Sequence, residues 1–340
     1  MTITADMTFG EIALLPEFAG FGEHLMLCRP STWERMWNKP IVSHMNSDAN
    51  PYETARVLRG LNRIVELVDD GRQVAYDIWD EADCIRDPTR RNTKLFFFPG
   101  RPRAPFIIAV SGGGYQSVCH QVEGFPVAPE LNDAGYNVFV LSYRVRVEPL
   151  MPRPIDDLNR AVRFVLENSA KFNVAKSYAV IGFSAGAHLT AEWGTDNKGF
   201  ASYGCEAPKA LALCYAPIDL HGFENASDNR FLDSVCGGAG RDSLDDFCIN
   251  QHVWEQYPPT YLWQCADDDI VSPDNYEKMV DALDAAGVHH EGVMYSEGGH
   301  ALMKPHAPVN CAPILGRANK RPTPHIGTDS GIPPGSVPSV

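Results

Sequence analysis

The sequence predicts an α/β protein with a mostly parallel, doubly wound sheet. Short apolar runs rich in β-branched residues recur from about residue 74 onward, as is typical of strands buried on both faces. Helical patterns alternate with these runs, which favours parallel strands joined by crossover helices. The composition is that of an ordinary globular protein, with 44% hydrophobic and 21% charged residues among 340. A chain of this length buries enough surface to fold without disulfides.

The amino-terminal residues 1–72 are predicted to form a helical extension. Within it, Thr54–Asp70 places apolar residues at helical spacing, and Gly71 is a suitable stop. Beyond it, helices are predicted at Asp156–Asn168, at Asn275–Ala286 and in the run that follows residue 186. The predicted strands are Val74–Trp79, Thr93–Phe98, Pro105–Val110, Asn137–Ser142, Ser177–Gly182, Ala210–Tyr215, Thr260–Cys265 and Gly292–Ser296.

The α/β domain is predicted to span residues 73–305. Residues 220–256 interrupt the alternation with a polar, glycine-containing stretch. We expect this stretch to be a cap-like insertion over the carboxyl ends of the strands, where open α/β sheets bind ligands. Residues 306–340 are rich in proline and poor in apolar residues, which predicts an extended or disordered tail.

The charge and the cysteines exclude several classes of function. With 29 basic and 43 acidic residues the net charge is −14, so nucleic acid and anionic membranes are poor partners. The same charge favours neutral or cationic substrates. No apolar run is long enough to span a bilayer, and the first ten residues lack the pattern of a signal peptide. The nine cysteines include no C-x-x-C pair, so we expect a cytoplasmic protein with reduced thiols.

A nucleophile motif lies at Gly182-Phe-Ser-Ala-Gly186. It follows a predicted strand and precedes a helical run, which is the context in which a G-x-S-x-G turn exposes its serine. Ser184 is therefore the candidate nucleophile. The run Ser111-Gly-Gly-Gly-Tyr115 follows an earlier strand, and its glycines let backbone N–H groups approach a reacting oxygen closely. We expect Gly113, Gly114 and Ala185 to form an oxyanion hole.

A serine nucleophile needs a base and an orienting carboxylate, in the chain order Ser, acid, His. The best histidine is His300, which follows a strand-like run and two glycines. The best acid lies just after the strand that ends at Cys265, where Asp268 is preferred and Asp267 is the alternative. Tyr115, Phe183 and His221 are the side chains expected to bind substrate.

Metal and nucleotide chemistry are not expected. Asp219-x-His221 and His289-His290 lack a supporting set of carboxylates, and the chain has no H-E-x-x-H. It also has no Walker lysine motif and no G-x-G-x-x-G after a strand, so no cofactor is predicted.

Taken together and in order, these motifs resemble the α/β-hydrolase superfamily, in its esterase/lipase branch. The likeness rests on the two glycine motifs above, Ser142-Tyr-Arg-Val145, Ala266-Asp-Asp-Asp-Ile-Val271 and Glu297-Gly-Gly-His300, and covers about residues 95–305. It is greatest to xylan and feruloyl esterase-like acetyl esterases, with hormone-sensitive-lipase-like carboxylesterases nearby. The resemblance implies the α/β-hydrolase fold and a triad of Ser184, His300 and Asp268, because the family acid precedes the valine by three places, as Asp268 precedes Val271.

The leading hypothesis is a serine hydrolase that cleaves a small carboxylic ester through an acyl-enzyme. The nucleophile segment also resembles that of kynurenine formamidases, and peptidase-like enzymes share the catalytic domain, so an amide hydrolase is the alternative. A non-catalytic hydrolase-fold binding protein is the third hypothesis. The physiological substrate, its acyl length and the presence of a homo-oligomer stay open.

Overall fold

The computed structural model describes residues 1–41, 54–224, 229–237 and 240–300. Its centre is an eight-stranded sheet in the order β1-β2-β4-β3-β5-β6-β7-β8. The predicted tail at 306–340 lies outside the described residues. The strands are β1 (Ala75–Tyr76), β2 (Lys94–Phe98), β3 (Phe106–Val110), β4 (Asn137–Ser142), β5 (Tyr178–Phe183), β6 (Leu211–Cys214), β7 (Thr260–Cys265) and β8 (His290–Tyr295).

The sheet is parallel from β4 through β8, and β1 and β2 are antiparallel at one edge. The predicted mostly parallel α/β fold is thus confirmed. The predicted strand over Val74–Trp79 is reduced to Ala75–Tyr76, because Asp80 caps a short helix by accepting from the N–H of Asp83. The last strand begins at His290 rather than at Gly292, so His290 belongs to the strand.

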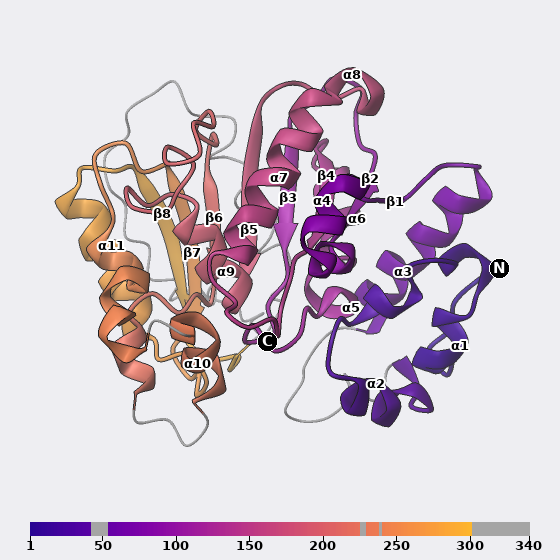
Figure 1. Ribbon diagram of the computed structural model, residues 1–340, viewed down its shortest axis with the longest axis horizontal. Helices are drawn as coiled ribbons and strands as arrows, with labels where there is room; N and C mark the ends of the chain where they lie inside the picture. The colour runs from indigo at the N-terminus through magenta and orange to yellow at the C-terminus, as the bar shows by residue number, and fades with distance from the viewer. Residues whose placement is uncertain (42–53, 225–228, 238–239, 301–340) are drawn as a thin grey trace, which may run out of the picture.

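Helices cover both faces of the sheet (Figure 1). The α-helices are α1 (Phe9–Ala13), α2 (Pro30–Trp37), α3 (Thr54–Asp69), α4 (Glu81–Arg86), α5 (His120–Glu123), α6 (Val127–Asp133), α7 (Arg153–Glu167), α8 (Ser169–Phe172), α9 (Ala185–Glu192), α10 (Arg230–Cys236) and α11 (Asp274–Ala285). Short 3₁₀ helices are η1 (Pro16–Phe18), η2 (Gly22–Leu25), η4 (Pro88–Asn92), η5 (Leu220–Phe223), η7 (Arg241–Phe247) and η8 (Ile249–Gln251).

The alternation of side chains along each strand divides the core into two layers. In β3, Ile108 packs in the layer under α7, α9 and α11, whereas Ile107 and Ala109 pack in the layer under α3 and α6. The continuous apolar strands in the sequence follow from this arrangement, since both faces are buried.

The amino-terminal segment packs on the second of these layers. Its helices α1, α2 and α3 lie together on one side of the molecule, opposite α10 and α11 (Figure 1). The buried ring of His24 bonds Ser142 at the end of β4 (Nδ1 to Oγ, 2.9 Å), and Leu27 pairs with Val118 beside the glycine run. Arg56 of α3 forms a salt bridge with Glu130 of α6. The segment therefore contacts the end of β4 and the loop that carries the glycine run.

A buried ion pair fixes the loop between β4 and α7. The Arg144 side chain is 1% exposed and bonds both carboxylate oxygens of Asp157, which is fully buried. Asp157 also accepts from the indole N–H of Trp79 at 2.9 Å, and Arg144 reaches Asp87. Several hydrogen bonds satisfy each charge, as a buried pair requires.

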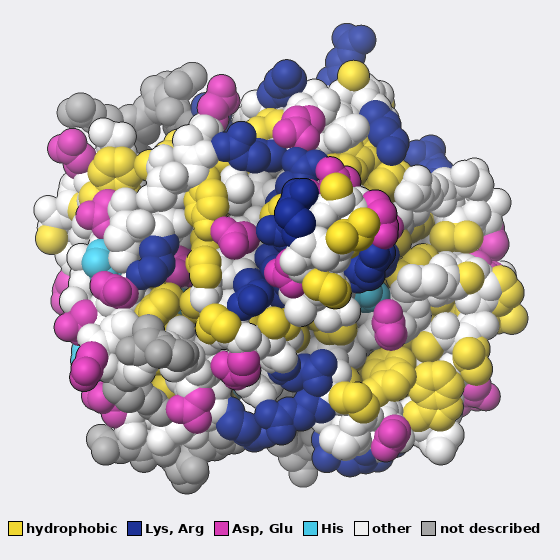
Figure 2. Space-filling view, in the orientation of Figure 1, with side chains coloured by type: hydrophobic (Ala, Val, Ile, Leu, Met, Phe, Trp, Pro, Cys, Tyr) yellow, Lys and Arg dark blue, Asp and Glu magenta, His cyan; other side chains and the backbone are white. Residues whose placement is uncertain are grey.

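The surface charge is unevenly distributed. Figure 2 shows Lys and Arg side chains gathered across the middle of one face, over the region of α4 and α7, with acidic side chains scattered around them. Among the described residues, no helix combines the length and the apolar character needed to cross a lipid bilayer.

Candidate active site

Ser184 lies at a sharp turn between β5 and α9. Its backbone angles are φ 51° and ψ −124°, a strained conformation for a residue with a side chain. A Cβ on Gly182 would lie 2.2 Å from the carbonyl oxygen of Gly186, and one on Gly186 would lie 2.2 Å from that of Val110. Only glycine fits at either position, which explains the residue pattern around the serine.

Ser184, His300 and Asp268 form a continuous hydrogen-bonded chain. Nε2 of His300 lies 2.9 Å from Oγ of Ser184, and its Nδ1 lies 2.9 Å from Oδ2 of Asp268. The three residues follow β5, β8 and β7, so their meeting is a consequence of parallel strands ending at one edge of the sheet. The Tyr215 ring packs edge-on against the imidazole, with ring centroids 5.0 Å apart.

The carboxylate of Asp268 is 5% exposed and held from several sides. Its Oδ1 accepts from the N–H groups of Ile270 and Val271, at 3.0 and 2.9 Å. Its Oδ2 accepts from Nε2 of Gln264 at 2.9 Å, in addition to the imidazole. Asp267 instead accepts from the N–H groups of Gly298 and Gly299, at 2.9 and 2.7 Å. Of the two candidate acids, Asp268 is the one that contacts His300, and Asp267 shapes the loop before it.

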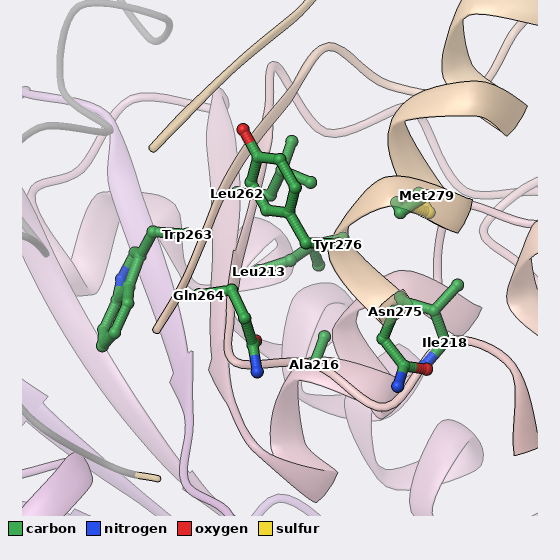
Figure 3. A pocket seen from close by; sticks show the side chains of 9 residues that line it. All are labelled: Leu213, Ala216, Ile218, Leu262, Trp263, Gln264, Asn275, Tyr276 and Met279. Carbon is green, nitrogen blue, oxygen red and sulfur yellow. The ribbon is translucent and has the colours of Figure 1, made fainter. Parts of the chain in front are cut away.

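Gln264 is a polar side chain in the otherwise apolar strand β7. Figure 3 shows it beside a small cavity between β6, β7 and α11, with the amide of Asn275 across from it. Gln264 also donates to the carbonyl of Val271 at 2.8 Å, so it ties both ends of the turn that holds Asp268. Asn275 accepts from the N–H groups of Ile218 and Asp219, at 2.8 and 3.0 Å. The cavity measures about 10 Å³, too small for an organic ligand.

Three residues beside the serine have backbone N–H groups without an acceptor in the described structure. Gly113 and Gly114 have φ values of 131° and 60°, and a Cβ on Gly113 would lie 2.3 Å from the carbonyl oxygen of Ser117. The N–H groups of Gly113, Gly114 and Ala185 have no acceptor within the described part of the chain. All three residues line the cavity in front of Ser184, so these donors are available to a ligand oxygen.

The glycine run rests on a buried carboxylate that the sequence did not reveal. Glu123 is 4% exposed; its Oε2 accepts from the N–H of Gly112 at 2.6 Å. Its Oε1 accepts from the hydroxyl of Tyr215 at 2.9 Å. One side chain therefore connects the glycine run to the tyrosine that packs on His300.

The cavity in front of Ser184 has a volume of about 560 Å³. Its wall is mostly apolar, with one basic and one acidic side chain, so the negative charge of the whole protein is not concentrated there. The side chains that define it are Pro217, Phe223, Arg230, Phe231, Asp269 and Ile270. The stretch predicted to be an insertion contributes Phe223, Arg230 and Phe231 to the lining of this cavity.

Of the three side chains predicted to bind substrate, none lines this cavity. Tyr115 is fully buried, bonds Nδ1 of His188 at 2.9 Å and stacks behind Phe231, which takes its place at the wall. Phe183 points into the core below the turn and packs against Tyr215. The ring nitrogens of His221 bond Glu224 and Asp245 at the surface, at 3.1 and 2.8 Å. The sequence could not say which side chains of these segments line the cavity.

One cluster has the spacing of metal ligands among the described residues. The ligand atoms of Asp219, His221 and Cys248 lie within 4.8 Å of one another. Asp219 is paired with Lys278 at 2.6 Å, and burial raises the pKa of the Cys248 thiol to about 11. A protonated thiol is a poor metal ligand, and so is a carboxylate that already forms an ion pair with a lysine. No disulfide joins the described cysteines, and Cys311 lies outside the described residues.

Comparisons with known proteins agree with the fold. The family BD-FAE matches residues 99–283. Endo-1,4-beta-xylanase B of Butyrivibrio fibrisolvens is 29% identical over 206 residues, which cover 58% of this chain and 32% of that protein. Esterase LipC of Mycobacterium tuberculosis is 26% identical over 248 residues, covering 68% and 59%. The chain thus spans 59% or less of the length of either of these curated relatives.

Solved structures show the same fold. The acetyl ester-xyloside bifunctional hydrolase from Caldicellulosiruptor lactoaceticus superposes with a TM-score of 0.57 at 30% identity, covering 66% of this chain and 86% of that one. A truncated carbohydrate esterase from gut microbiota, at 18% identity, has a TM-score of 0.59 and covers 72% and 95%. The family resemblance predicted from the motifs is confirmed, and the chain belongs to the BD-FAE family, within the esterase branch of the α/β-hydrolases.

Proposed function

We propose that this protein is a serine hydrolase that cleaves a small carboxylic ester through an acyl-enzyme. The observation that carries the proposal is the hydrogen-bonded chain from Ser184 through His300 to Asp268. Ser184 lines one cavity together with three residues whose backbone N–H groups have no acceptor in the described structure. This arrangement supplies a nucleophile, a base, an orienting acid and hydrogen-bond donors for an oxyanion.

In the first half of the reaction, Oγ of Ser184 attacks the acyl carbon while Nε2 of His300 takes its proton. The carbonyl oxygen becomes an oxyanion, which the amides of Gly113, Gly114 and Ala185 stabilise. The imidazolium then gives its proton to the leaving alcohol as the bond between the acyl carbon and the ester oxygen breaks.

In the second half, water attacks the acyl-serine. His300 takes a proton from the water and returns it to Oγ of Ser184 as the carboxylic acid leaves, so the enzyme is regenerated. Asp268 holds the proton on Nδ1 throughout, which keeps Nε2 free to act as the base.

The cavity and the relatives favour a small acyl group on a carbohydrate-sized alcohol. A volume of about 560 Å³ holds a small organic molecule, and its mixed wall of aromatic, basic and acidic side chains suits a neutral polar one. The alignment covers 86% of the C. lactoaceticus protein, which is described as an acetyl ester-xyloside bifunctional hydrolase. Acetylated xylo-oligosaccharides are therefore the first substrates to test.

The direct experiment replaces Ser184 with alanine. Hydrolysis of p-nitrophenyl acetate should fall by about 10⁶-fold, and labelling by a fluorophosphonate probe should disappear. Ser202→Ala, at an exposed serine, is the matched control and should keep both. Undiminished hydrolysis by Ser184→Ala would refute the assignment, and failure of the unaltered protein to label would favour a non-catalytic binding protein.

The bond that is cleaved is tested by competition among substrates. Turnover of an acetyl ester, N-formylkynurenine and a dipeptide amide is compared at equal enzyme concentration. We expect the highest kcat/KM for the ester. A higher value for either amide would replace the esterase by an amide hydrolase that uses the same three residues.

A further inference from the structure

A second cavity lies on the other side of α10 from the cavity of Ser184. Its volume is about 570 Å³, and the two cavities share no residue in the described part of the chain. Helix α10 separates them: Arg230 and Phe231 face the first, whereas Val235 and Cys236 face the second. The volume is in the range of small-molecule sites.

Glu192 is the chemical centre of this second cavity. It is the last residue of α9, it is 2% exposed, and it lines the cavity. Neither of its carboxylate oxygens has a hydrogen-bond partner among the described residues. Buried carboxylates in native proteins are almost always paired or hydrogen-bonded, so two unsatisfied oxygens at a cavity wall require an explanation.

The surroundings of Glu192 do not supply a partner. Burial raises its pKa to about 7; Lys198 opposes this rise and Asp156 adds to it. Lys198 forms no ion pair with Glu192 in the described structure, because its Nζ is held by the carbonyl of Asp246 and lies 4.2 Å from the centre of the Phe247 ring. Tyr115 and Tyr203 also lie near, and burial raises the pKa of both hydroxyls, so they stay neutral.

Lys198 also lines the cavity, with its ammonium group held by the carbonyl of Asp246, and the remaining side chains of the wall are apolar. Pro149, Met151, Pro152, Val235 and Phe247 line the space around the carboxylate. An apolar body would therefore be covered by these side chains while a polar group at its end reached Glu192. The polar group must donate hydrogen bonds, because an ionised carboxylate only accepts them.

We propose that the second cavity binds a small organic cation, in which an amine or amidine on an apolar body donates its N–H groups to both oxygens of Glu192. A planar amidinium meets a carboxylate through two parallel hydrogen bonds, and its positive charge compensates the buried negative one. A buried carboxylate that lacks a partner lowers the free energy of unfolding at pH values above the pKa of the free side chain. A ligand that pairs with the carboxylate would offset this loss of stability.

The test measures benzamidine binding by isothermal titration calorimetry at pH 6 and pH 8. Glu192 is about one-tenth ionised at the first pH and about nine-tenths at the second, while the amidinium stays charged. We therefore expect about tenfold tighter binding at pH 8 and the release of about half a proton per ligand bound at pH 7. Prior labelling of Ser184 with a fluorophosphonate should leave this binding unchanged, since the two cavities are separate.

Two variants locate the binding. Glu192→Gln should weaken binding at pH 8 at least tenfold and abolish its pH dependence, whereas Glu255→Gln, at an exposed carboxylate, should bind as the unaltered protein does. Val235→Phe keeps the carboxylate and fills the space, and should also weaken binding. Absence of binding at pH 8, equal affinity at the two pH values, or loss of binding on labelling Ser184 would each overturn the proposal.

Discussion

The two adjacent aspartates after β7 offer a sharp test of the triad, because only one of them is buried and contacts the imidazole. Asp268 accepts from the imidazole of His300 and from two backbone N–H groups, whereas Asp267 accepts from two glycine N–H groups of the loop. Asparagine at either position keeps the size of the side chain and changes only its charge and one acceptor. The pair Asp268→Asn and Asp267→Asn therefore separates orientation of the base from support of the loop.

The structure predicts how an asparagine at 268 would lie. Its carbonyl oxygen must take the place of Oδ1, since the N–H groups of Ile270 and Val271 both point there. The amide nitrogen then takes the place of Oδ2 and presents its hydrogens to Nδ1 of His300. The imidazole responds by moving its proton to Nε2, which can no longer accept the proton of Ser184. A loss of about 10⁴-fold in kcat follows, as expected of a base held in the wrong tautomer.

An asparagine at 267 has a milder effect. Its oxygen still accepts one of the two glycine N–H groups, and the site is exposed to water that satisfies the other. We expect less than a tenfold change in kcat. The assay is hydrolysis of p-nitrophenyl acetate under saturating substrate, with circular dichroism to show that both variants fold. Equal losses in the two variants, or a larger loss at 267, would refute the assignment of Asp268 as the acid.

Four further outcomes follow from buried groups. Glu123→Leu should lower kcat by up to about 100-fold with little change in KM, because the glycine run loses a hydrogen-bond partner; wild-type kcat would contradict this. Gly186→Ala should lower Tm and activity together, since its Cβ would lie 2.2 Å from a carbonyl oxygen; an unchanged Tm would count against the close approach. Asp157→Asn should cost about 3–5 kcal/mol in urea unfolding because it leaves a buried arginine short of a partner; a cost under about 1 kcal/mol would show that the pair contributes little. Burial lowers the pKa of His24 and of His188 to about 4, against 6.5 for the free side chain, so the unfolded chain binds protons that the folded one excludes. The free energy of unfolding should therefore be fully retained above pH 6.5 and fall by about 1.4 kcal/mol per pH unit for each histidine between pH 6.5 and 4; urea titrations that show no such slope would refute the burial argument.

The parts of the candidate site that the sequence predicts are those that follow strands. The serine turn, the glycine run and the acidic turn each come directly after a continuous apolar run, and parallel strands bring such points to one edge of the sheet. The choice between Asp268 and Asp267 could not be made in this way. It depends on which carboxylate accepts the N–H groups of the following turn, and that is a property of backbone geometry rather than of spacing.

Other parts left no local signal. Glu123 lies in a four-residue helix, and its partners Gly112 and Tyr215 are 11 and 92 residues away along the chain. The sequence predicts that Tyr115 binds substrate, yet its hydroxyl bonds the buried His188 and its ring stacks on Phe231. Packing between segments far apart in the chain determines the partners of Glu123 and the orientation of Tyr115. The residue pattern within one segment cannot predict such packing.

The same long-range packing explains how a strained turn is held in place. Ser184 and Tyr215 both have positive φ values, at the ends of neighbouring strands, and each would relax if its surroundings were loose. The N–H of Ser184 is tied to the carbonyl of Cys214 at 3.0 Å, and the hydroxyl of Tyr215 is tied to Glu123. Because Glu123 also holds the glycine run and Tyr215 packs on His300, the donors, the nucleophile turn and the imidazole share one buried support. An oxyanion is stabilised most by dipoles that are already in position, so the proposed ester hydrolysis would depend on this shared support.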